Sequence, residues 1–267
     1  MVADIRALLF ALMMAIALDA RSDGGPIVFQ STETPPIWSE TMPSGGMGGE
    51  ILQLLSDAAG VKYSINYLPV KRFRASSAAY IVGDPGILTT ERNRAVFPIA
   101  TFHAAYFYYR PHHDALEIHR MADLSGHNLG VMRGTIEDMD QFVRHKINVE
   151  ESDSIETLLR MLKKGRIDVA ILVDLAGRHL IREMFPEEQD DFVQVVIHGS
   201  VRPIAVMVDL DTPNGKDIAQ LYRQVLKKTL GSRQYREILQ KYYRKGAEAD
   251  AAHEALDRLL EYYESTW

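Results

Sequence analysis

Segment 89–94 places two threonines, a glutamate and two arginines within six residues, in the order Thr-Thr-Glu-Arg-Asn-Arg. A threonine that precedes a helix can cap its first turn, which would leave the arginines on the solvent face. A guanidinium can instead hold a carboxylate through two parallel hydrogen bonds. Arg92 is the candidate clamp, and Thr89 and Thr90 are candidate caps or ligand contacts. The residue types alone leave both interpretations open.

A second polar group lies where a strand is expected to give way to a helix. Arg133, Gly134 and Thr135 follow the apolar stretch 128–132 and precede a helix expected over 136–145. Thr135 can cap that helix, and the free N–H groups of its first turn would equally suit a ligand carboxylate. Ligands of parallel α/β sheets collect at such strand ends.

Asp174 follows the apolar, β-branched stretch 167–173. One interpretation is again a helix cap, and the other is a carboxylate that binds a ligand amine. Taken singly, each of these segments fits a cap better than a ligand contact. A site is therefore indicated only by the set as a whole.

Common motifs for metals and cofactors are missing from the sequence. The chain has no cysteine, which excludes thiolate catalysis and Cys-ligated zinc. It contains no H-E-x-x-H, G-x-S-x-G, Walker A or G-x-G-x-x-G run. The pair His112-His113 precedes Asp114, but adjacent side chains on an extended segment point to opposite sides. We therefore expect neither a metal nor a cofactor.

Length and charge limit how many domains the chain can form and which partners it can bind. With 267 residues, of which 46% are hydrophobic, the chain can form one large domain or two lobes. A net charge of −6 gives no general attraction to nucleic acid or to anionic membranes, so we expect no nucleic-acid partner. The apolar run 7–18 after Arg6 is shorter than the roughly 20 residues of a membrane span. Residues 1–20 therefore predict a signal peptide and a periplasmic mature chain, the alternative being an uncleaved anchor or an apolar first helix.

Strand and helix patterns alternate along the mature chain in two blocks, which predicts two α/β lobes with parallel sheets covered on both faces. The aromatic segment 102–109 is expected to be a buried strand. The predicted elements are strands at 26–30, 61–67, 128–132, 167–173, 192–197 and 203–208, and helices at 50–59, 136–145, 154–164 and from 216 onward.

The ordered set of segments resembles the family 3 extracellular solute-binding proteins, which are the polar amino acid receptors of ABC importers. The resemblance extends over about 26–244. It implies a two-lobed type II periplasmic-binding-protein fold, each lobe a mainly parallel sheet flanked by helices, with crossover segments near Tyr109 and Gly199. The best-matching segments are 89–97, 123–135 and 164–174, and the implied lobes are 26–108 plus 200–267 and 109–199.

The resemblance also implies roles for single residues. The family's arginine that holds the ligand α-carboxylate maps to Arg92, and Arg94 is then expected to face outward. The Gly-Thr pair that offers an N–H and a hydroxyl to the same carboxylate maps to Gly134 and Thr135. The acid that holds the ligand ammonium maps to Asp174.

The sequence departs from the family pattern in the first lobe. Ile87 occupies a position where the family usually has Ser or Thr. Lys71, Arg72 and Arg74 lie near the expected aromatic residue, which favours a ligand more acidic than an ordinary α-amino acid. Trp38 is then a candidate stacking face for the ligand.

We expect a monomeric receptor that captures a small carboxylate-bearing solute for an ABC permease. Three alternatives stay open: a sensor that signals to a membrane protein in trans, an interaction protein without a ligand, and an enzyme. The enzyme would resemble cyclohexadienyl dehydratases, with Glu91, Glu137 or His179 as its acid. Segment 247–267 extends beyond the family's usual end and predicts a helix packed on its own lobe.

Overall fold

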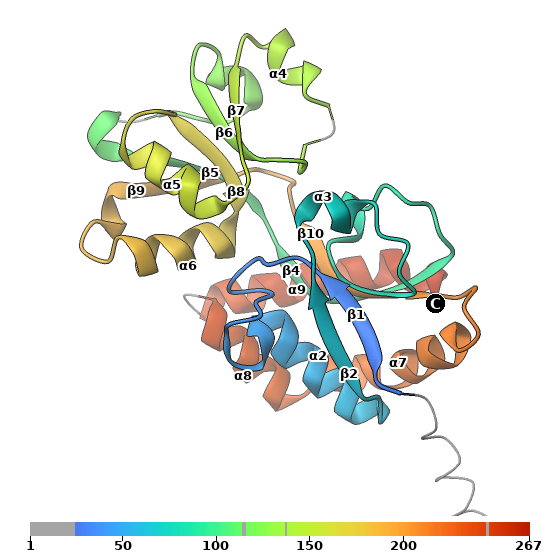
Figure 1. The fold of residues 1–267 in the computed structure, drawn as a ribbon. Coiled ribbons are helices and arrows are strands. Elements are labelled where there is room, and N and C mark those ends of the chain that lie inside the picture. Colours follow the sequence, from blue (N-terminus) through green and yellow to red (C-terminus); the bar gives the residue numbers. More distant parts are fainter. Residues whose placement is uncertain (1–24, 114–115, 137, 244–245) are drawn as a thin grey trace, which may run out of the picture.

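A computed structural model describes residues 25–113, 116–136, 138–243 and 246–267. The expected signal peptide lies outside these residues, as do Asp114 and Glu137. Among the described residues, no helix is long and apolar enough to cross a membrane. The chain forms two five-stranded sheets, each flanked by helices (Figure 1).

The first sheet has the strand order β2-β1-β3-β10-β4. β1 runs parallel to β2 and β3, whereas β10 runs antiparallel to β3 and β4. β1 to β4 therefore all end at the same edge of the sheet. The elements of this lobe are β1 (Ile27–Ser31), α2 (Gly46–Ala59), β2 (Tyr63–Tyr67), α3 (Val70–Arg74), β3 (Tyr80–Gly83), β4 (Arg94–Phe102), β10 (Arg202–Asp209), α7 (Gly215–Leu230), α8 (Arg233–Tyr242) and α9 (Gly246–Tyr263).

The second sheet has the order β7-β6-β8-β5-β9. β6 is parallel to β7 and β8, and β5 is antiparallel to β8 and β9. Its elements are β5 (Ala104–Tyr109), β6 (Asn128–Met132), α4 (Asp140–Arg144), β7 (Asn148–Ser152), α5 (Ile155–Lys163), β8 (Val169–Val173), α6 (Asp174–Met184) and β9 (Phe192–Val196). Short 3-10 turns lie at Pro43–Gly45, Pro85–Ile87, Arg110–His112, Met121–Leu124, Gln189–Asp191 and Glu264–Thr266.

The chain passes between the two sheets twice. β4 leads into β5 through His103, and segment 197–201 leads from β9 into β10 (Figure 1). The expected boundary between 108 and 109 thus falls at the far end of β5, while Gly199 lies within the second passage. The predicted α/β organisation is confirmed, and each sheet is mixed because β10 and β5 run against their neighbours.

The alternation of side chains along β10 shows how the first sheet is covered on both faces. Ile204, Val206 and Val208 belong to the large core that contains residues of α2 and α7. Ala205 and Met207 belong to a smaller cluster on the other face. Phe73 of α3 and Tyr263 of α9 join that smaller cluster, so α3 is anchored to the sheet by one buried aromatic ring.

Two predicted helices differ from the observed structure. The helix expected to carry Arg92 and Arg94 does not form: residues 89–93 are irregular and Arg94 begins β4, because the following segment pairs with β10. The helix expected at 136–145 is reduced to α4. Thr135 directs its N–H and its hydroxyl to the Met132 carbonyl, at 3.1 and 2.7 Å, and so closes a turn rather than capping a helix.

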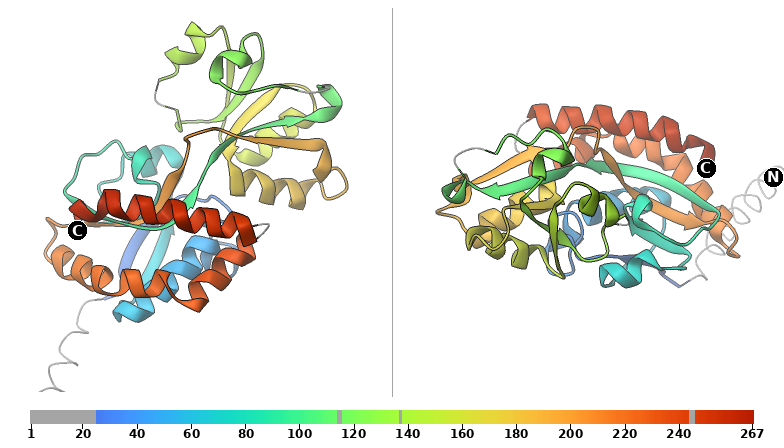
Figure 2. Two further views of the ribbon diagram at one scale, coloured as in Figure 1. Left: turned by 180° about the vertical axis from the view of Figure 1, so that it is seen from behind. Right: turned by 90° about the horizontal axis from the view of Figure 1, so that it is seen from above.

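The chain's last residues cover β4, which lies at one edge of the first sheet. Trp267 Nε1 donates a hydrogen bond to the Val96 carbonyl at 2.6 Å, and the Val96 N–H donates to Thr266 Oγ1 at 3.1 Å. The Trp267 ring stacks on Phe97 with centroids 5.6 Å apart. Figure 2 shows α9 lying across this lobe. The prediction that segment 247–267 packs on its own lobe is confirmed.

Replacing Trp267 by Ala should lower the free energy of unfolding by about 2 kcal/mol, because the change removes a partly buried ring and leaves the Val96 carbonyl without its donor. Urea unfolding followed by far-UV circular dichroism measures the loss. Tyr262→Ala is the matched control, since the Tyr262 side chain is 74% exposed and its loss should change stability by less than about 0.5 kcal/mol. Equal effects of the two changes would contradict the assigned role of Trp267.

Candidate functional site

Polar residues of both lobes meet near the carboxyl ends of strands. Arg74, the last residue of α3, donates a hydrogen bond from Nη1 to the carbonyl of Gly134, which follows β6. Figure 1 shows α3 on the side of its lobe that faces the other lobe. We call Arg72, Arg74, Arg133, Gly134 and Thr135 the candidate site. It joins the basic helix of one lobe to the Arg-Gly-Thr turn of the other.

Burial and hydrogen bonds fix α3 in place. The Phe73 side chain is only 1% exposed and packs under the helix. Thr89 donates its N–H and its hydroxyl to the Arg74 carbonyl, at 2.8 and 3.0 Å. Thr90 donates its hydroxyl to the carbonyl of Ser76 at 2.6 Å. The two threonines therefore support the segment that carries Arg74, and they cap no helix.

Arg92 lies at a different place from the other predicted site residues. Its Nη1 is 2.6 Å from Oδ2 of Asp209, whose side chain is fully buried at the end of β10. Asp209 pairs in register with Arg94, the first residue of β4, so this ion pair lies by the amino ends of β3 and β4. The structure does not bring Arg92 into contact with Gly134, Thr135 or Asp174. Its role as a ligand clamp stays a prediction.

Arg94, expected to face outward, folds back onto the chain instead. It donates from Nη1 to the Thr90 carbonyl at 3.2 Å and from Nη2 to the Ser76 carbonyl at 3.3 Å. Burial lowers the pKa of Arg94, and the nearby Asp209 carboxylate partly offsets that effect. The pair of arginines thus ties the loop before β4 to the sheet.

The Arg-Gly-Thr turn has the backbone shape that its sequence indicates. Gly134 has φ of +78°, a left-handed conformation that glycine adopts without strain. Arg133 is turned away toward two acids, with Nε 2.8 Å from Asp153 and Nη1 3.4 Å from Glu151. The hydrogen bond from Arg133 to Asp153 raises the pKa of the guanidinium. Gly134 is the part of the turn that contacts α3 of the other lobe, through its carbonyl.

Asp174 lies at the first crossover and not beside Gly134. Its side chain is buried, and Oδ1 accepts hydrogen bonds from the His103 N–H at 3.1 Å and the Leu175 N–H at 2.8 Å. Burial raises the pKa of Asp174, and these two donors offset the effect only in part. One turn further along α6, Arg178 forms an ion pair with Glu248 of α9 at 3.2 Å. The carboxylate that was predicted to hold a ligand amine therefore holds the hinge backbone.

Trp38 offers no ring face to a ligand in this structure. Its side chain is 2% exposed and belongs to the core of the first lobe. An added Cβ at Gly48 would approach the ring to 2.6 Å, which shows how closely the backbone of α2 packs on it. A stacking role for Trp38 is thus contradicted by its burial.

Sequence reasoning noted Arg72 and Arg74 but missed the helix that carries them. The available signal was Pro69 followed by Val70-Lys71-Arg72-Phe73-Arg74, since proline favours the start of a helix. One apolar ring among three basic residues further indicates a short helix that is buried on one side only.

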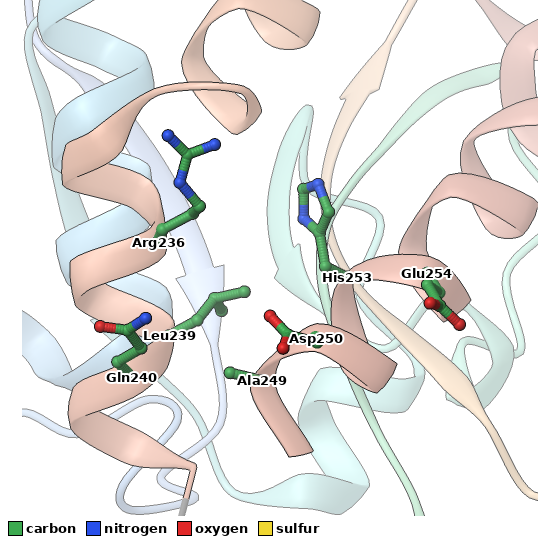
Figure 3. A pocket seen from close by; sticks show the side chains of 7 residues that line it. All are labelled: Arg236, Leu239, Gln240, Ala249, Asp250, His253 and Glu254. Atoms are coloured by element: carbon green, nitrogen blue, oxygen red, sulfur yellow. The ribbon is translucent and has the colours of Figure 1, made fainter. Parts of the chain in front are cut away.

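Other polar clusters and pockets lie apart from the candidate site. Among the described residues, no group of three His, Cys, Asp or Glu side chains is arranged to hold a metal ion. One surface pocket lies between α8 and α9, where Arg236 and Gln240 stand opposite Asp250 (Figure 3). A wider groove between α2 and α8 contains Glu50 and Lys241, which pair at 2.5 Å. Both lie on helices of the first lobe.

Comparisons with known proteins establish the fold. No protein-family model and no curated protein sequence matches the chain. The ligand-binding core of GluR0 in complex with L-glutamate superposes with a TM-score of 0.63 at 12% identity, covering 83% of this chain and 99% of that one. The substrate-binding protein of an amino acid ABC transporter gives 0.60 at 16% identity, with 83% and 100% covered.

A histidine kinase sensor domain with similarity to periplasmic binding proteins also matches, with a TM-score of 0.62 at 16% identity over 82% of this chain and 96% of that one. Strand order, the two crossovers and these superpositions together define a type II periplasmic-binding-protein fold, as predicted. At such low identity the likeness defines the fold and leaves the ligand open.

Replacing Arg92 by Ala should destabilise the ligand-free protein by about 1–3 kcal/mol, because it leaves the buried Asp209 carboxylate without its donor. The loss is smaller than for a fully buried ion pair, since the Arg92 side chain is 39% exposed. Adding Asp209→Asn should restore part of that loss, since the remaining amide carries no charge. Urea unfolding of the two single variants and the double variant gives the coupling energy. If Arg92→Ala left the stability intact and abolished only ligand-induced stabilisation, Arg92 would be a ligand contact instead.

Asp174 should make stability fall as pH rises. Its pKa is raised in the folded protein, so its favourable contribution is complete below the ordinary carboxyl pKa of about 4 and is lost as pH rises through the folded value. Asp174→Asn keeps an acceptor oxygen and cannot ionise, so it should gain stability relative to the unmodified protein as pH increases across that range. Urea unfolding from pH 4 to 8 measures this gain.

The exposed Asp190 provides the matched control for that series. Asp190→Asn should show a stability difference from the unmodified protein that varies much less with pH. A pH-independent difference for Asp174→Asn would contradict the assignment of a buried, ionisable carboxylate at the hinge.

Proposed function

We propose that this chain is an exported receptor that captures a small carboxylate-bearing, amino acid-like solute between its lobes and delivers it to an ABC importer. The observation that carries the proposal is the contact of Arg74 with Gly134, which brings a cationic helix of one lobe against the Gly-Thr turn of the other. Guanidinium, backbone N–H and hydroxyl groups are the donors that a carboxylate requires.

Closure of the lobes is the mechanism that this fold offers. The two sheets are joined only by the passages at His103 and 197–201 within the described residues, so small backbone rotations there can move one lobe against the other. A solute held by groups of both lobes would favour the closed arrangement. Affinity would then depend on α3 and on the Arg-Gly-Thr turn together.

A sensor is the second candidate, and the similarity to a histidine kinase sensor domain supports it. In that case the same closure would be transmitted to a signalling protein. Genes for a permease and an ATPase beside the gene for this chain would support import instead. An enzyme has less support: His179 pairs with Glu183 on α6 at 3.3 Å, Glu91 is exposed on the loop before β4, and Glu137 lies outside the described residues.

The proposal is tested by mass spectrometry of small molecules carried through native purification, followed by thermal shift and calorimetry with the compounds found. We expect a carboxylate compound at about one equivalent per chain. The Thr135 hydroxyl, which donates to the Met132 carbonyl in this structure, would turn to the ligand carboxylate on closure. Thr135→Val should therefore weaken its binding by on the order of tenfold, because the variant loses this single O–H donor but keeps the shape of the side chain.

Thr212→Val is the matched control for this change. Thr212 donates its hydroxyl to a carbonyl three residues earlier, that of Asp209 at 2.9 Å, as Thr135 does to Met132. It lies in the turn between β10 and α7, and within the described part of the chain none of its hydrogen bonds involves a residue of the candidate site. Equal effects of the two variants, or the absence of any carboxylate ligand after a broad screen, would contradict the proposed function.

A further inference from the structure

α9 is packed on the first lobe along its length and meets the second lobe near its amino end. Ala249 and Ala252 belong to the core of the first lobe, and the Ala252 carbonyl accepts a hydrogen bond from the Thr101 hydroxyl at 3.4 Å. Glu248 instead meets Arg178 of α6, whose Nη1 lies 3.2 Å from one carboxylate oxygen and 3.4 Å from the other. A helix of one lobe thus makes a charged contact with a helix of the other (Figure 2).

The two passages between the sheets are hydrogen-bonded to each other. The Ile197 N–H donates to the Ala104 carbonyl at 3.0 Å. Ser200 Oγ accepts from the Ala104 N–H and donates to the Ala104 carbonyl, both at 3.1 Å. The Asp174 N–H donates to the His103 carbonyl at 2.9 Å. Because the passages hold each other and the start of α6, we expect the second lobe to rotate about this group as a whole.

The contact between α6 and α9 lies away from the centre of that rotation. Arg178 is one helical turn beyond Asp174, so a rotation of the second lobe moves it relative to Glu248. The two side chains are 14% and 39% exposed, so the ion pair is partly shielded from solvent. In this structure the pair forms while Arg74 contacts Gly134. An arrangement that separates α6 from α9 loses the pair, so the pair favours the present arrangement.

We propose that α9 holds the two lobes in the arrangement of this structure through the ion pair between Arg178 and Glu248. The inference concerns movement between the lobes, and its consequence for binding rests on the proposed function. A solute would meet lobes that are already held together, so less of its binding free energy would be needed for closure. Loss of the pair would lower the fraction of binding-competent chains and raise the apparent Kd by the same factor.

Distances between spin labels on the two lobes test the proposal without any ligand. The chain has no cysteine, so labels attach only where one is introduced. Arg160→Cys on α5 and Lys228→Cys on α7 place them at exposed positions of the second and the first lobe. Double electron–electron resonance of the otherwise unmodified chain should give one main distance. In Arg178→Gln and in Glu248→Gln, the population outside that distance should rise by about fivefold.

A double-mutant cycle assigns this effect to the ion pair. Arg178→Gln combined with Glu248→Gln should change the populations by less than the sum of the two single changes, because each single variant already breaks the pair. The cycle separates the pair from any other contact of the two side chains. Glu264→Gln is the matched control, since it breaks an ion pair with Lys227 at 3.4 Å in which both partners belong to the first lobe. Thermal melts report whether each variant is folded.

The outcomes separate this inference from the proposed function. If the unmodified chain shows several distances and the single variants show the same ones, the inference fails while lobe closure remains supported. Additive effects of the two changes, or an equal effect of Glu264→Gln, would also overturn the assignment to this ion pair. If every chain gives one narrow and unchanged distance, the inference is overturned and the closure mechanism of the proposed function loses its support.

Discussion

The buried carboxylate of Asp174 is the interaction on which the arrangement of the two lobes depends. It holds the N–H of His103, the residue between β4 and β5, against the first turn of α6. Leu175, the next residue, packs in the core of the first lobe although α6 belongs to the second. A single acid thus fixes the backbone of the first crossover and places α6 against both lobes. The energetic cost of its burial is evident in its raised pKa.

The C-terminal helix extends this hinge contact. α9 packs on β4, and its Glu248 pairs with Arg178 of α6, so the segment beyond the expected end of the fold touches both lobes. The same segment supplies Thr266 and Trp267 to the edge of β4. Edge strands with open N–H and C=O groups invite pairing with other chains. α9 therefore has two roles. It covers the β4 edge of the first sheet, and it restricts movement at the first crossover.

Sequence periodicity predicted the long helices and seven of the ten strands in the described residues, because burial on one face leaves a recurring pattern of apolar residues within the segment itself. It missed β3, β4 and β7. It failed where tertiary pairing decided the outcome. Segment 89–94 has helix-start chemistry, but pairing of β4 with β10 begins at Arg94 and excludes a helix. The resemblance supplied Gly134 and Thr135, whose turn is local. It could not foresee that Arg92 would meet Asp209, which lies more than a hundred residues away along the chain.

The hydrogen bonds of Asp174 also set a condition on movement between the lobes. One oxygen of its carboxylate, Oδ1, accepts the N–H groups of His103 and Leu175. A rotation that separated His103 from α6 would leave a buried backbone donor without a partner, which costs about 1–3 kcal/mol. Movement of one lobe against the other is therefore least costly when it keeps the hydrogen bond between His103 and Asp174.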